Sequence, residues 1–170
     1  MSLENGRLYL DLGIGKGGQY IKNDPTDVLR IGGDSRQYPL LYIKGEYKIP
    51  GVRFDASLNG GKTFLPFADG SLNRVDIFFP HNTLLEALTI SNHPLWTEFG
   101  RILQPEGSVQ ATFDVPQDGT RQIKVGKRLI DIPHPETRLW RTATDAGFSV
   151  NIKKLNAEEV EKIGSWYARR

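Results

Sequence analysis

Short apolar runs alternate with helix-like segments along most of this chain, and this alternation limits the folds that it can adopt. Five runs have the length and the flanking turn residues of β-strands: residues 7–13, 27–34, 51–56, 74–80 and 107–115. The helix-like segments between them are residues 17–25, 36–47 and 83–104. The last of these contains "SNHP", whose proline should divide it into two helices. Such alternation is typical of βαβ units, so we predict an α/β fold with a mostly parallel sheet covered by helices on both faces.

The rest of the chain is expected to add a hairpin, two helices and one further strand. In order, these are an irregular hairpin within residues 116–133, a helix over 135–146, a strand over 148–155 and a helix from 156 onward. Asn156 is suited to cap the last helix, because Glu158 and Glu159 would follow it in the first turn. A chain of 170 residues without repeats is predicted to form one domain, residues 1–170.

Composition restricts the classes of protein to which the chain can belong. It has 38% hydrophobic and 25% charged residues and no apolar run of the about 18 residues that a membrane helix needs, which indicates a soluble globular protein. The N-terminal "MSLENGR" lacks the regions of a secretory signal, so we expect a cytoplasmic protein with no membrane partner. With no cysteine and three scattered histidines, no metal site is expected. A net charge of +2 permits a nucleic-acid partner without requiring one.

Four glycines crowd the stretch "LYLDLGIGKGGQY", residues 8–20, at the end of the first predicted strand. They are Gly13, Gly15, Gly17 and Gly18. Glycine gives up more backbone freedom on folding than any other residue, so such a cluster indicates a turn whose shape side chains would forbid. In open α/β sheets this first strand-to-helix turn is where a backbone approaches a cofactor closely.

Two classes of nucleotide cofactor fit this turn. From Gly13 to Gly18 the segment has the Gly-x-Gly-x-x-Gly spacing of dinucleotide-binding proteins, but Asp11 begins an Asp-Leu-Gly-x-Gly-x-Gly pattern. Asp34 follows about twenty residues later, where an acid can accept hydrogen bonds from two ribose hydroxyls. Both cofactor classes use such an acid, so these residues alone leave the choice open.

The segment "LPFADGSLNRVDIFF", residues 65–79, resembles the region before and through the fourth strand of class I S-adenosylmethionine-dependent methyltransferases. "LDLGIGKG", Asp34 and "LWTEFGRILQPEGSV" extend the resemblance in the same order over residues 7–155. The resemblance implies a single Rossmann-like class I methyltransferase domain, and it favours S-adenosylmethionine over a dinucleotide.

The resemblance also implies that seven residues hold S-adenosylmethionine. Its methionine and ribose portions would contact Asp11, Gly13, Gly15 and Gly17, its ribose hydroxyls Asp34, and its adenine Asp55 and Ala56. The cofactor has no phosphates, so its hydroxyl, ammonium and amino groups need acceptors, which carboxylates and carbonyls supply. Each residue has a structural explanation too, since acids cap helices and glycines form tight turns, but four features in register favour cofactor binding.

A narrower resemblance starts at "FFPHNTLLEAL", residues 78–88, and continues at "SWYARR", residues 165–170. Both segments are similar to motifs of the aminoglycoside-resistance methyltransferases that modify N1 of adenine 1408 in 16S rRNA, in which two tryptophans hold the flipped base. Here His81 takes the first position, followed by Asn82 in place of glycine, and Tyr167 takes the second, next to Trp166.

This narrower resemblance places the catalytic residues at the end of the fourth strand. Backbone carbonyls near Phe79 and Pro80, together with His81, would orient the attacking nitrogen, and Tyr167 would stack on the base. His81 could also act through its near-neutral pKa, or it could simply cap the helix that begins near Thr83.

Other conspicuous residues have a structural interpretation. His93 and His134 neighbour prolines and are expected to be plain surface residues. Four aromatic residues are expected in the core: Phe64, Phe67, Phe78 and Phe79. Seven basic residues could form a phosphate-facing patch, although solvated surface charges are commoner: Lys124, Lys127, Arg128, Lys153, Lys154, Arg169 and Arg170.

Class I methyltransferases usually end on a further antiparallel strand. This chain stops at Arg170, so we expect its sheet to lack that strand. An open sheet edge favours association, so we expect "QIKVGKRLIDI", residues 122–132, or a second copy in a homodimer to cover it.

The sequence therefore predicts an S-adenosylmethionine-dependent methyltransferase that methylates a nitrogen of RNA, with the small ribosomal subunit as a partner. Methyl transfer from a sulfonium is a direct displacement, so the protein mainly positions cofactor and nucleophile in line. Two alternatives stay open: a small-molecule acceptor, and a non-catalytic methyltransferase-like binding protein.

Overall fold

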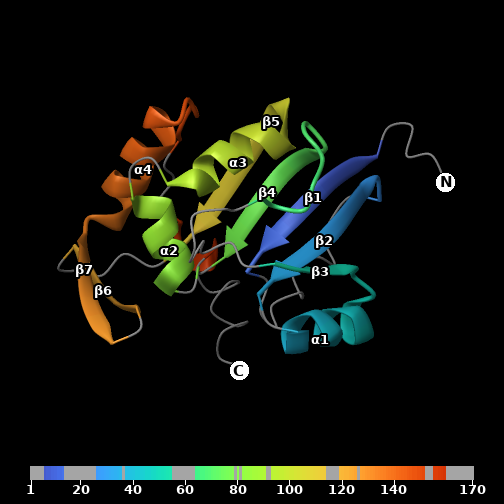
Figure 1. The fold of residues 1–170 in the computed structure, drawn as a ribbon, viewed down its shortest axis with the longest axis horizontal. Helices are drawn as coiled ribbons and strands as arrows, with labels where there is room; N and C mark the ends of the chain where they lie inside the picture. Colours follow the sequence, from blue (N-terminus) through green and yellow to red (C-terminus); the bar gives the residue numbers. More distant parts are fainter. Residues whose placement is uncertain are drawn as a thin grey trace.

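The computed structural model describes residues 6–13, 26–35, 37–54, 64–78, 80, 82–90, 93–113, 119–125, 127–151 and 155–159. Its elements, in chain order, are β1 (Arg7–Leu12), β2 (Val28–Asp34), α1 (Gln37–Tyr47), β3 (Gly51–Arg53), β4 (Leu72–Phe78), α2 (Asn82–Thr89), α3 (Pro94–Ile102), β5 (Leu103–Thr112), β6 (Thr120–Val125), β7 (Arg128–Pro133) and α4 (Pro135–Asp145). The first five strands form one sheet in the order β3-β2-β1-β4-β5, and every neighbouring pair is parallel (Figure 1). The prediction of an α/β fold with a mostly parallel sheet is confirmed.

Most predicted elements lie where the sequence indicated, including two helices separated by the "SNHP" segment. β5 begins earlier than predicted, directly after α3, and β3 ends at Arg53. The strand expected over residues 148–155 is wrong in its described part, since 148–151 and 155 are not in a strand. The helix expected over 17–25 falls outside the described residues.

Apolar side chains on one face of the sheet form the main core. Because side chains alternate along a strand, Leu10 and Leu12 of β1 share this face with Val75 and Ile77 of β4. The core side chains of α2 and α3 pack onto it: Leu84, Ala87, Leu88, Leu95, Trp96, Phe99 and Ile102. These two helices therefore hold the central strands of the sheet from one side (Figure 1).

α3 begins at a histidine cap. Nδ1 of His93 accepts a hydrogen bond from the backbone N–H of Leu95 at 3.2 Å, and Pro94 follows at the first helical position. Burial lowers the pKa of His93, which favours the neutral ring that can accept this bond. The expectation of a plain surface residue is thus wrong for His93, whereas His134, just before α4, is exposed as predicted.

The irregular hairpin within 116–133 is confirmed as β6 and β7, which pair antiparallel with each other. In the described chain neither strand joins the main sheet, so the expectation that residues 122–132 cover its edge is wrong. Instead, Ile130 and Ile132 of β7 pack against Leu85 of α2, and α2 lies between the sheet and the hairpin (Figure 1).

Two further sequence expectations can be compared with the structure. Asn156 and Glu159 exchange reciprocal hydrogen bonds of 2.9 Å, in which each side chain accepts from the other residue's backbone N–H, so the predicted cap is confirmed. Among the aromatic residues, Phe67 packs against the core and Phe78 is half-buried, but Phe64 is 75% exposed, so its assignment to the core is wrong. Phe79 lies outside the described residues.

No helix in the described ranges is long and apolar enough to cross a membrane.

Candidate cofactor site

The carboxyl ends of β1 and β2 lie side by side and bring three of the predicted cofactor residues together. Asp11 pairs with Gly32 in the β1–β2 register, and the N–H of Gly13 donates to the carbonyl of Gly33 at 2.7 Å. Asp34 is the last residue of β2. Asp11, Gly13 and Asp34 therefore occupy one short stretch of the sheet edge at which ligands bind in such folds.

Gly13 adopts a backbone conformation that requires glycine. Its φ angle is +73°, in the left-handed region that other residues rarely enter. A Cβ at this position would lie 3.3 Å from Cδ2 of Leu84 in α2, so space is restricted as well. The sequence argument that this turn has a shape forbidden to side chains is thus correct at Gly13, while Gly15 and Gly17 lie outside the described residues.

Two carboxylates are buried at this edge. Asp11 is 1% exposed and Asp34 is 5% exposed. By strand alternation both point to the face opposite Leu10, and Gly32, which pairs with Asp11 and lies two residues before Asp34, adds no side chain to that face. Ionised carboxylates are acceptors only, and this pair of buried acids is suited to bind hydroxyl or ammonium donors.

A charged cluster adjoins Asp11 on the same face. Asp76 of β4, the register partner of Asp11, accepts from Nη1 of Arg30 and from Nε of Arg74, both at 2.6 Å. The guanidinium carbons of both arginines lie 5.4 and 5.3 Å from the ring centre of Tyr9, within cation–π range. The cluster joins β2 and β4 across β1. It was not predicted from the sequence, in which the one pattern that indicates it is charge at alternate positions of the apolar strands.

Two aromatic rings, those of Phe54 and Phe67, pack next to the carboxyl end of β2. Phe54 follows β3, and its N–H donates to the carbonyl of Asp34 at 3.2 Å. Its ring covers Gly33, where an added Cβ would lie 2.6 Å from the ring atom Cζ. Phe67 meets this ring edge-to-face, with the ring centres 6.0 Å apart. The predicted adenine contacts Asp55 and Ala56 come next in the chain but lie outside the described residues.

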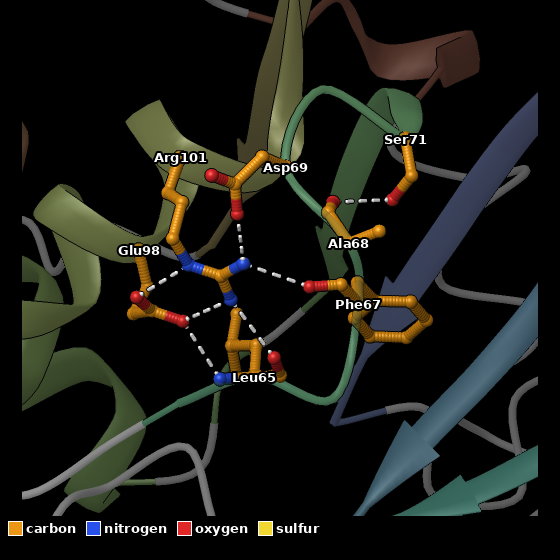
Figure 2. Close-up of polar contacts among 7 residues, drawn as sticks. All are labelled: Leu65, Phe67, Ala68, Asp69, Ser71, Glu98 and Arg101. Carbon is orange, nitrogen blue, oxygen red and sulfur yellow. Dashed lines mark hydrogen bonds and ion pairs between the residues drawn. The ribbon is translucent and has the colours of Figure 1, made fainter.

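Arg101, at the end of α3, holds the loop that carries Phe67 (Figure 2). Its guanidinium donates to both carboxylate oxygens of Glu98, to Asp69, and to the carbonyls of Leu65 and Phe67, at 2.6 to 2.9 Å. These hydrogen bonds raise the pKa of Arg101 and lower that of Glu98, because they favour the charged forms. Glu98 also accepts from the N–H of Leu65 at 2.8 Å.

The predicted acceptor side is described only at Pro80. This residue is buried just beyond the end of β4, and β4 neighbours β1, so Pro80 lies at the same edge as Gly13. Phe79, His81 and Tyr167 lie outside the described residues. Of the predicted basic patch, Lys127 and Arg128 are exposed at the hairpin turn. In the described part of the chain no group of three or more histidine, aspartate or glutamate side chains could hold a metal ion.

The fold of this chain matches those of solved structures, although no protein-family model and no curated protein matches the sequence. The 16S rRNA methyltransferase KamB matches 96% of this chain and 80% of its own, with a TM-score of 0.67 and 16% identity. This chain therefore has a methyltransferase fold. The antibiotic-resistance methyltransferase Kmr matches 91% of this chain and 83% of its own, with a TM-score of 0.63 and 18% identity.

The same fold also occurs in the [4+2]-cyclase SpnF, with a TM-score of 0.65 and 18% identity. The match covers 96% of this chain but 60% of SpnF. At such identities the likeness establishes a Rossmann-like methyltransferase fold, and the reaction has to be argued from the site.

Proposed function

We propose that this chain is an S-adenosylmethionine-dependent methyltransferase. The observation that carries the proposal is the meeting of Gly13, in its left-handed conformation, with the buried carboxylates of Asp11 and Asp34 at the carboxyl ends of β1 and β2. A cofactor without phosphates needs hydrogen-bond acceptors there, and these carboxylates supply them.

Each described residue has a defined task in such a site. Asp34 accepts hydrogen bonds from the ribose hydroxyls, and Asp11 provides negative charge toward the cationic methionine end. Gly13 lets the backbone turn sharply at the end of β1, in a left-handed conformation that other residues rarely enter. Gly15, Gly17, Asp55 and Ala56 complete the proposed site. S-adenosylmethionine supplies an activated methyl group, and the protein's residues orient it and exclude water.

The proposed acceptor is a nitrogen of RNA, with the small ribosomal subunit as the partner. Its support is the position of Pro80 beside the carboxyl ends of β1 and β2, here called the cofactor edge, together with the similarity of fold to a 16S rRNA methyltransferase. In this proposal Phe79 and Pro80 offer carbonyls to the attacking nitrogen, and His81 and Tyr167 hold the base. A nitrogen with a free lone pair needs no strong general base. The protein would act in the cytoplasm, as a monomer or homodimer.

A small-molecule acceptor is the second candidate. It is favoured by SpnF, because a [4+2]-cyclase is built on the same fold. A non-catalytic binding protein with the same fold would be the third, and it differs from both enzymes in transferring no methyl group.

The first test is calorimetric titration of S-adenosylmethionine and its demethylated product into the purified protein. Asp34→Asn should weaken binding by about 10- to 150-fold, the range for losing hydrogen bonds to a charged group. Asp27→Asn is the matched control, because Asp27 lies at the opposite end of β2 and pairs with exposed Arg7. If the wild-type protein binds neither compound, or both variants weaken binding equally, the proposal is wrong.

The acceptor is tested separately, with a radiolabelled methyl group and purified small or large ribosomal subunits. Transfer to the small subunit alone, with affinity that falls steeply as salt rises, supports the RNA acceptor. Cofactor binding without transfer to either subunit counts against the RNA acceptor and leaves the small-molecule acceptor and the non-catalytic binding protein.

A further inference from the structure

Arg101 does not touch the cofactor edge, but its contacts lead there through a continuous set of packed groups. Its guanidinium uses all five N–H donors, which hold the carbonyls of Leu65 and Phe67 as well as the carboxylates of Glu98 and Asp69. Its own carbonyl accepts from the N–H of Gly70 at 2.8 Å. The loop of residues 65–71 is thus fastened to the end of α3 at several points (Figure 2).

The next contact is between two rings. The hydrogen bond to the carbonyl of Phe67 also restrains the Cα atom from which its side chain extends. The ring of Phe67 stands at 90° to the ring of Phe54. An edge-to-face pair is sensitive to orientation, because it depends on the positive edge of one ring meeting the negative face of the other. A shift of the loop would therefore change the packing of Phe67 against Phe54.

Phe54 in turn contacts the candidate cofactor edge. Its N–H donates to the carbonyl of Asp34, and its ring covers Gly33, which has no side chain to fill that space. The carbonyl of Gly33 accepts from Gly13. The position of the ring of Phe54 thus influences both Asp34 and Gly13.

We propose that Arg101 is a positioning residue for cofactor binding, which acts through Phe67 and Phe54 on the carboxyl ends of β1 and β2. The inference rests on the proposed function, since it names what holds the cofactor edge in shape. Both charged partners of the Arg101–Glu98 pair stay ionised near neutral pH, so the device is a permanent support rather than a switch.

The test compares Arg101→Lys and Phe67→Leu with the control Thr142→Val. Lysine keeps the charge next to Glu98 but cannot donate in five fixed directions, and leucine keeps an apolar side chain without a ring. The hydroxyl of Thr142 lies 2.7 Å from the carbonyl of Leu88 in α2, far along the chain from residues 65–71. Its removal leaves that carbonyl bonded to the indole N–H of Trp96 at 3.1 Å, so the control loses stability only through a remote hydrogen bond.

Two measurements separate positioning from general destabilisation. Hydrogen exchange at the amides of Gly13 and Phe54 is followed by NMR without cofactor, and the dissociation constant of the demethylated cofactor is measured by calorimetry. We expect both Arg101→Lys and Phe67→Leu to speed exchange and weaken binding about tenfold, within the range for residues that influence a site without touching the ligand. When the variants are compared at an equal loss of global stability, Thr142→Val should change neither the exchange at these amides nor the dissociation constant.

Unchanged exchange at Gly13 and Phe54 in the two variants would overturn the inference. Faster exchange with unchanged affinity would overturn it too, because the edge would then not matter for binding. If the wild-type protein binds no cofactor, the proposed function fails, whereas the exchange data still decide whether Arg101 positions the edge.

Discussion

The buried ion cluster on the sheet allows the sharpest stability prediction. Asp76 is fully buried, and its two oxygens accept from Arg30 and Arg74 at 2.6 Å each. The side chain of Arg30 is only 5% exposed, whereas that of Arg74 is 30% exposed and also donates to Gln110. In Asp76→Ala the charge of Arg30 stays buried and is no longer neutralised by Asp76.

The expected loss follows from that burial. Removing one partner of a buried ion pair costs about 3–5 kcal/mol in the free energy of unfolding, because the desolvated charge remains. For a domain of this size each kcal/mol lowers the melting temperature by about 2–4 °C, so a decrease of roughly 6–20 °C is expected. Arg74→Met should cost less, because Arg74 already reaches water.

Equilibrium unfolding in urea measures these differences, with the midpoint and the slope both recorded. Asp27→Ala is the control, since the Arg7–Asp27 pair is exposed and should contribute little. The double variant Arg30→Met/Asp76→Leu should regain most of the lost stability, because it removes both buried charges. Equal effects of Asp76→Ala and Asp27→Ala, or a double variant less stable than Asp76→Ala, would refute the reasoning.

Three further predictions concern single residues. Gly13→Ala should lower the free energy of unfolding by about 1–2 kcal/mol because of its positive φ, and it should weaken cofactor binding; unchanged calorimetric affinity would count against the site. Glu98→Gln should destabilise the protein at neutral pH, and because the folded pKa of Glu98 is lowered from about 4.5, this difference should shrink as pH falls below that unfolded value; a constant difference in urea titrations from pH 7 to 3 would contradict this. Asn156→Ala should cost about 1 kcal/mol of local helix stability, detected as faster amide exchange at Glu159, and Asn156→Asp should restore most of it.

The order of the elements could be predicted because each parallel strand is a short apolar run bounded by turn residues. β5 shows where this method is weakest: "LQPEGSVQAT" is mostly polar, since β5 is the edge strand and much of it faces solvent. The apolarity of Phe64 predicts a core position, but Leu65 takes the buried position. Apolarity alone therefore does not indicate which of two neighbouring apolar residues is buried: Phe64 is 75% exposed and Leu65 is 2% exposed.

The local geometry of the candidate site could be predicted where it depends on neighbours in sequence, as at the tight turn of Gly13. The supporting contacts could not, because they join residues that are far apart in the chain. Arg30 and Asp76 are 46 positions apart, and Arg101 and Phe67 are 34 apart. A single charge in an apolar segment gives no indication of its partner, so pairing of this kind depends on the register of the sheet.

Glycine at the cofactor edge creates a requirement that other residues must meet. Gly13 lets the chain turn with a positive φ angle and Gly33 lets an aromatic ring come close, but neither has a side chain with which to hold its own backbone in place. Rigidity must therefore come from groups packed around them: Leu84 against Gly13, and Phe54 against Gly33. Phe54 needs a support of its own, because it follows a strand of only three residues. Arg101 supplies it through Phe67, so a residue at the end of α3 becomes necessary for the shape of an edge that it never touches.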